Sequence, residues 1–110
     1  MRLSAVAEKD FQDIVESTVE QFGDEQALVY VVTIALALEA LAEGPLPIDA
    51  KRRDEIRKGL YSLHVARQGR KGRHFVMFRI APRARDVIEV LRLLHDSMDL
   101  PRHFQIPHEP

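Results

Sequence analysis

The apolar residues between positions 11 and 22 recur with the spacing of a helix. They are separated by three or one positions, so they form a single stripe on a helix of 3.6 residues per turn. Gly23 is expected to end this helix, because glycine tolerates the left-handed conformation that follows a last turn. Asp24 is expected to cap a second helix. A connection this short makes the two helices an antiparallel hairpin.

The second predicted helix, over about residues 25–43, is apolar on nearly every side. A helix without a polar face is buried on more than one side. Because the first helix covers one side only, we expect a sheet to cover more of it and a partner to cover what remains. Its most apolar stretch, residues 27–42, falls short of the roughly 20 residues that span a bilayer, so no membrane contact is expected.

After a charged connection over residues 48–58, the apolar positions alternate with the period of two that is typical of strands. Short turns with glycine or proline separate three such runs, which we predict as strands over residues 60–67, 74–81 and 87–94. Three strands with short links form an antiparallel meander. Residues 2–5 are predicted to add a short edge strand.

The order of these elements predicts an α+β fold. A short strand is followed by a two-helix hairpin that packs on a three- to four-stranded antiparallel sheet, and residues 99–104 form a terminal turn or short helix. With 110 residues there is room for one domain, which we assign to residues 1–104. Residues 105–110 contain two prolines and are predicted to be a frayed tail.

Charge is distributed unevenly along the chain, although the formal net charge is −1. Residues 1–50 contain 2 basic and 10 acidic side chains, whereas residues 51–104 contain 14 basic and 6 acidic ones. This asymmetry favours an anionic partner for the second half. The same distribution also fits two halves that neutralise one another within one fold.

The residue types exclude several classes of site. The chain contains no cysteine, which rules out disulfides, thiolate-bound metals and a cysteine nucleophile. The five histidines lack metal-ligand spacing, and no glycine-rich phosphate loop is present, so we expect neither a metal nor a cofactor. The N-terminus lacks the apolar segment of a signal peptide, and we expect a cytoplasmic protein.

Arginines on the predicted strands are the strongest candidates for a functional site. On regular strands, Arg79 shares a face with Phe75 and Met77. Arg92 shares one with Ile88, Val90 and Leu94. Arginines among apolar residues favour an anion such as an RNA phosphate or a partner carboxylate. An arginine with a packed stem and a solvated guanidinium gives the same pattern. His95, at a strand end near Arg92, has the pKa range of a general acid or base, although a histidine there can also simply cap the strand by hydrogen bonding.

The segment 87–104, in which Arg92-Leu93-Leu94-His95 ends a strand before an aspartate-containing turn, resembles the C-terminus of ParE toxins of the RelE/ParE superfamily. Residues 3–14, 20–23 and 53–63 are similar to the family's first strand and helix, hairpin junction and entry to the meander. The resemblance covers residues 1–104 and implies a type II toxin with a helical hairpin on an antiparallel sheet. It also implies a ParD-like antitoxin with an acidic, amphipathic C-terminal part, in a heterotetramer or larger complex.

Two targets follow from the two branches of this superfamily. The ParE branch inhibits DNA gyrase by binding it, and it meets DNA only through the antitoxin, whereas the RelE branch cleaves mRNA on the ribosome. RelE-type enzymes carry a tyrosine or an extra lysine near the C-terminus. Here the only tyrosines are Tyr30 and Tyr61, and residues 72–110 contain no lysine, which favours ParE.

The resemblance assigns residues to three expected roles. Antitoxin binding is expected of Leu28, Val31, Phe75, Met77, Arg79 and Arg92. Target binding is expected of the basic residues Arg70, Lys71, Arg73 and Arg102, three of which lie in a turn at 68–73 that is longer than in many relatives. Under the ribonuclease alternative, the catalytic candidates are Arg79, Arg92 and His95.

Overall fold

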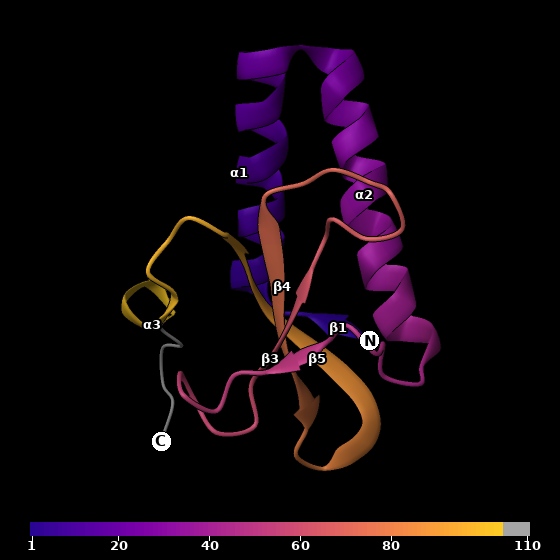
Figure 1. The fold of residues 1–110 in the computed structure, drawn as a ribbon, viewed down its shortest axis with the longest axis vertical. Coiled ribbons are helices and arrows are strands. Elements are labelled where there is room, and N and C mark those ends of the chain that lie inside the picture. Colours follow the sequence, from indigo (N-terminus) through magenta and orange to yellow (C-terminus); the bar gives the residue numbers. More distant parts are fainter. Residues whose placement is uncertain (105–110) are drawn as a thin grey trace.

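A helical hairpin packs against one face of a five-stranded sheet, as Figure 1 shows. The structure, a computed structural model, describes residues 1–104, apart from the side chains of Arg85, Asp86 and His103. The hairpin consists of α1 (Ala5–Phe22) and α2 (Asp24–Glu43), and its connected end extends beyond the sheet. The tail predicted at 105–110 lies outside the described residues.

The sheet has the strand order β1-β5-β4-β3-β2. The central meander of β3 (Tyr61–His64), β4 (His74–Ala81) and β5 (Ala84–His95) is antiparallel, as predicted. The α+β fold is therefore confirmed.

The two edge strands differ from the prediction. β1 (Arg2–Leu3) runs parallel to β5, which makes the sheet mixed. β2 (Lys51–Arg52) is a fifth strand inside the segment predicted as a connection. Two-residue strands are too short to show an alternating pattern, and charged residues are typical of edges.

Helix α1 begins six residues earlier than the predicted start at residue 11, because Ser4 caps it. The Ser4 hydroxyl accepts a hydrogen bond from the Ala7 amide at 2.9 Å and donates one to the Leu91 carbonyl at 2.9 Å. This second bond ties the helix start to β5. At the hairpin junction Gly23, with φ of 90°, is the residue before α2, and Asp24 is already helical rather than the predicted cap.

Apolar side chains form a separate cluster on each face of the sheet. The helix-facing cluster joins both helices to the strands and includes Ile34, Leu38, Leu63, Phe78, Val90 and Leu93. On the other face, the short helix α3 (Leu100–His103) and the loop before β3 contribute to a second cluster that includes Leu60, Met77, Leu91, Leu94, Leu100 and Phe104. The sheet is therefore covered on both faces in its central part.

A register shift in β5 changes the orientation predicted for Arg92. Val90 lies opposite Phe78, and Arg92 lies opposite Met77, so the strand contains an extra residue at Leu91. Phe78 belongs to the helix-facing cluster and Met77 to the other one. Arg92 therefore does not share a face with Val90, as a regular strand would require.

Helix α2 is longer than its apolar stretch indicated. It spans 20 residues, with a mean hydropathy of 1.6 over its most apolar window, and so is long and apolar enough by composition to cross a membrane. The expectation that it falls short of a spanning length is therefore wrong. A helix that supplies one side of a core meets the same criteria, and Ile34, Leu38 and Leu41 of α2 are buried core residues.

Candidate functional site

The two strand arginines that were expected to hold a partner's anion have carboxylates within the fold. The Arg92 guanidinium donates to Asp10 of α1 through Nε at 2.8 Å and through Nη2 at 3.0 Å. Asp10 also accepts the Leu93 amide at 2.9 Å, just past the point where β1 stops pairing with β5. The Arg79 Nε donates to Glu89 on the neighbouring strand at 2.9 Å. Part of the charge asymmetry is therefore neutralised internally.

The apolar residues predicted to bind an antitoxin have very different surroundings. Leu28 is 68% exposed on α2, whereas Val31 is half-buried. Phe75 is partly buried beneath the Arg53 guanidinium, whose central carbon lies 5.1 Å from the ring centroid. Met77 is fully enclosed in the second cluster. A partner therefore cannot reach Met77 in this fold, because α3 and the loop before β3 already cover that part of the sheet.

The basic residues predicted to bind a target do not form one patch. Arg70 lies against α2, where it donates to the Thr33 hydroxyl at 2.9 Å and to the Val29 carbonyl at 3.3 Å. Lys71 is exposed in the β3–β4 loop. Arg102 is exposed on α3, which Figure 1 places away from that loop.

Three histidines that the sequence shows as scattered come together at one end of the sheet. His74 lies opposite His95 in the β4–β5 pairing, and their ring centroids are 5.1 Å apart. The His64 Nε2 lies 2.9 Å from Asp96, which also accepts the Arg73 Nε at 3.0 Å. We call His64, His74, His95, Asp96 and Tyr30 the histidine cluster. Strand register and the packing of α2 on the sheet create it, so no local sequence signal predicted His64, His74, Asp96 or Tyr30.

Hydrogen bonds fix the protonation of His74. The Tyr30 hydroxyl accepts the Arg73 amide at 2.9 Å and lies 2.6 Å from His74 Nδ1, to which it can donate its proton when that nitrogen is unprotonated. Burial, reinforced by the neighbouring His95, lowers the pKa of His74 to about 4. Two hydrogen bonds lower the pKa of the Asp96 carboxyl. The one with His64 has the larger effect, and the one with Arg73 has the smaller effect. At neutral pH, His74 is therefore uncharged and Asp96 is ionised.

We expect the fold to lose stability in acid because of His74. Its pKa is about 4 in the folded chain, against the ordinary histidine value of 6.5 in an unfolded chain, so between these values the unfolded chain binds more protons. The stabilisation is complete above about pH 6.5 and is lost as the pH falls towards 4. Since the ring is partly solvated, we expect a loss of about 1–2 kcal/mol, which is less than the full shift implies.

Urea titrations from pH 7 to pH 4.5 test this expectation. The control is His74→Asn, whose amide oxygen can still accept the Tyr30 proton but does not titrate. The free energy of unfolding should fall more steeply with acid in the wild type than in this variant. Parallel pH profiles of the two proteins would contradict the assignment to His74.

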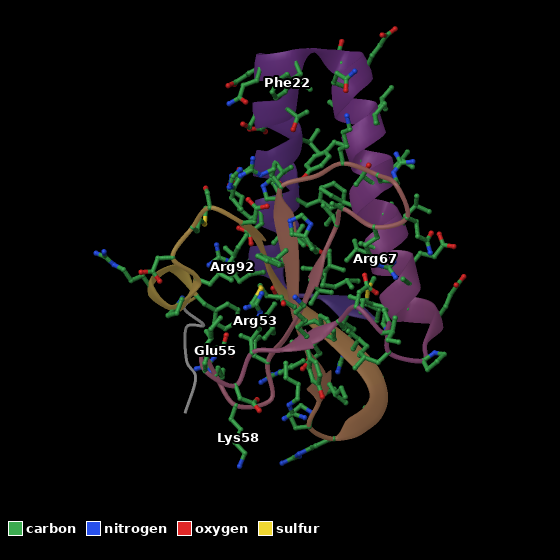
Figure 2. The ribbon with its side chains drawn as sticks, in the orientation of Figure 1. Phe22, Arg53, Glu55, Lys58, Arg67 and Arg92 are labelled. Atoms are coloured by element: carbon green, nitrogen blue, oxygen red, sulfur yellow. The ribbon has the colours of Figure 1, made fainter. Side chains whose placement is uncertain are left out.

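The catalytic candidates of the ribonuclease alternative already have partners within the fold (Figure 2, which labels Arg92). Arg79 pairs with Glu89, and Arg92 pairs with Asp10. His95 lies in the histidine cluster, where its Nδ1 accepts the Ser97 amide at 3.1 Å. Among the residues that the structure describes, no group of histidine, aspartate and glutamate side chains is placed to hold a metal ion.

The observed helical hairpin on a sheet with an antiparallel meander agrees with the fold that the resemblance to small toxins of the RelE/ParE type implied. The sequence profile described as ParE toxin of type II toxin-antitoxin system, parDE, matches residues 1–100. Toxin ParE1 of Caulobacter vibrioides is 31% identical over 102 residues, which cover 93% of this chain and 94% of that protein. Toxin ParE1 of Mycobacterium tuberculosis is 29% identical over 101 residues, which cover 92% and 93%. The chain belongs to the ParE toxin family of type II toxin–antitoxin systems, and this membership implies an antitoxin partner.

Proposed function

We propose that this toxin acts in the cytoplasm by binding DNA gyrase, and that a ParD-like antitoxin neutralises it in a heterotetramer or larger complex. Family membership supports this proposal. The observation that favours binding over RNA cleavage is the internal pairing of Arg79 with Glu89 and of Arg92 with Asp10. Arginines already held by carboxylates are poorly placed to take up a substrate phosphate.

The basic half of the sheet is the surface that fits an acidic antitoxin segment. Arg53 is partly exposed above Phe75, and Arg52 lies over the Tyr61 ring with 5.3 Å between the guanidinium carbon and the centroid. Such pairs present both a cation and an apolar surface, and together they suit an amphipathic acidic chain. Phe75 remains our candidate for this contact, whereas Arg79 is already held by Glu89.

For the target, the exposed cations Lys71 and Arg102 are the candidates that the fold leaves most accessible. Charge reversal at an interface edge weakens association with a complementary surface. We expect Lys71→Glu together with Arg102→Glu to raise the concentration needed for half-inhibition of gyrase by about tenfold. The matched control is Lys58→Glu with Lys51→Glu, which makes the same charge change at two exposed lysines, one in the loop before β3 and one on β2.

Supercoiling of relaxed plasmid DNA by purified gyrase tests the proposal. The full-length toxin should block supercoiling and increase gyrase-dependent DNA breaks. Unchanged supercoiling at a stoichiometric excess of toxin would overturn the proposed target. Loss of intact transcripts in a translation extract, without any effect on gyrase, would instead support the ribonuclease alternative.

A further inference from the structure

The outward side of α2 carries an apolar stripe that the fold leaves uncovered. Leu28, Val29, Val32 and Leu36 are 68%, 51%, 48% and 43% exposed. They recur at intervals of three and four residues, on the side opposite the core residues Ile34 and Leu41. We call these four residues the α2 stripe. Apolar residues with this spacing form the seam of a helix pair.

Carboxylates stand at both ends of the α2 stripe. Glu25 precedes Val32 by seven positions and Glu39 follows it by seven, so both lie on the same side of the helix as Val32. The 14 positions between them correspond to roughly 21 Å along the helix axis. Both side chains are exposed, and among the side chains that the structure describes no ion pair engages either of them.

Nearby cations do not cancel this negative charge. A hollow of about 190 Å³ beside the stripe is lined by Glu39 and Glu43 and also by Arg67 and Arg70. Arg67 is already paired with Asp49, to which its Nε donates at 2.7 Å. The remaining Arg70 faces two carboxylates, so the C-terminal end of the stripe stays acidic.

We propose that the α2 stripe docks a basic amphipathic helix of a partner protein, with apolar residues every three to four positions and a lysine or arginine near each end. Cations about 14 positions apart would meet Glu25 and Glu39 while the apolar residues cover Val32. This charge requirement is the opposite of that of the basic sheet. The α2 stripe therefore binds a basic segment, whereas the basic sheet suits an acidic one, so the two surfaces bind different segments.

Charge disfavours the other occupants of this surface. In a parallel pairing of two copies of α2, Glu25 faces Glu25. In an antiparallel pairing centred on Val32, Glu25 faces Glu39. Either arrangement places like charges opposite one another, which is unfavourable at a helix interface. An anionic lipid surface meets the same repulsion.

Two synthetic helical peptides test the proposal with the full-length toxin. Both are fluorescently labelled 18-mers with leucine at the seam positions of two heptads. One carries lysine at the two positions that match Glu25 and Glu39, and the other carries glutamate there. Fluorescence anisotropy should give about tenfold tighter binding for the lysine peptide, and added salt should reduce the difference.

A charge swap identifies the face that is bound. Glu25→Lys with Glu39→Lys should reverse the preference, so that the glutamate peptide binds more tightly. The control Glu16→Lys with Glu20→Lys makes the same charge change on α1 and should leave the lysine peptide preferred. Val32→Ser should weaken both peptides without lowering the melting temperature, because Val32 is half exposed.

Three results would overturn the proposal. These are equal affinity for the two peptides, self-association of the toxin that Val32→Ser abolishes, and binding to phosphatidylcholine–phosphatidylglycerol vesicles that the same variant abolishes. The assay contains neither gyrase nor an antitoxin. Its failure therefore leaves the proposed function untouched, and a failure of the gyrase assay leaves this docking surface untouched.

Discussion

Replacing Asp10 by alanine is expected to lower the free energy of unfolding by about 3 kcal/mol. The carboxylate holds Arg92 through two hydrogen bonds and accepts the Leu93 amide, which would otherwise be an open donor at the edge of β5. The Asp10 and Arg92 side chains are only 14% and 21% exposed. Removing one partner of so enclosed a pair costs much more than removing an exposed one, because water cannot fully replace the lost bonds.

Chemical denaturation of Asp10→Ala and of the control Asp13→Ala measures this effect. Asp13 pairs with Lys9 on the same helix, and both side chains are more than half exposed, so its removal should cost less than about 0.5 kcal/mol. Asp10→Asn keeps one oxygen acceptor and should fall between the two. Equal losses for Asp10→Ala and Asp13→Ala would show that the link between α1 and β5 contributes little to stability.

Gly72→Ala is expected to destabilise the chain by about 1–3 kcal/mol. An added Cβ would overlap the Val65 Cγ2 atom and lie 3.1 Å from Cε1 and 3.2 Å from the hydroxyl of Tyr30. Val65 is 1% exposed and has a branched, stiff side chain, so it cannot move aside cheaply. Displacement of Tyr30 would also disturb its hydrogen bond to His74.

A double-mutant cycle with Val65→Ala separates crowding from other effects. If the clash is the cause, Gly72→Ala should cost less in the Val65→Ala background than in the wild type. The measurement is the midpoint and slope of urea unfolding for the four proteins. An unchanged cost in both backgrounds would exclude Val65 as the source of the loss.

The periodic parts of the fold were predictable from local pattern. The two-helix hairpin and the strand at 74–81 match the structure closely, because a long apolar stripe or a dense run of branched and aromatic residues has one stable arrangement. The early start of α1 was missed because the helical pattern was counted from Phe11, although Ser4 is a local cap that accepts the Ala7 amide. The short edge strand predicted at residues 2–5 is present as β1, whereas β2 was missed because two charged residues show no strand pattern.

The candidate sites depended more strongly on contacts between distant residues. The sequence placed Arg92 and His95 near one another, but the extra residue at Leu91 and the contact with Asp10 decided where Arg92 points. The His74–His95 contact follows from strand register, which spacing along the chain does not encode.

The sequence by itself determined the hairpin, the central meander and their order, the separation of acidic helices from basic strands, and the resemblance to a toxin family. Those properties depend on neighbours within one or two turns of the chain, and short-range pattern records them directly. Tertiary structure alone decided which charges are already paired and which apolar residues stay exposed. Arg92 and Asp10 are 82 positions apart, and the exposure of Leu28 depends on which side of α2 the sheet covers. Both depend on how distant elements pack, because a side chain's partners and its burial are set in three dimensions.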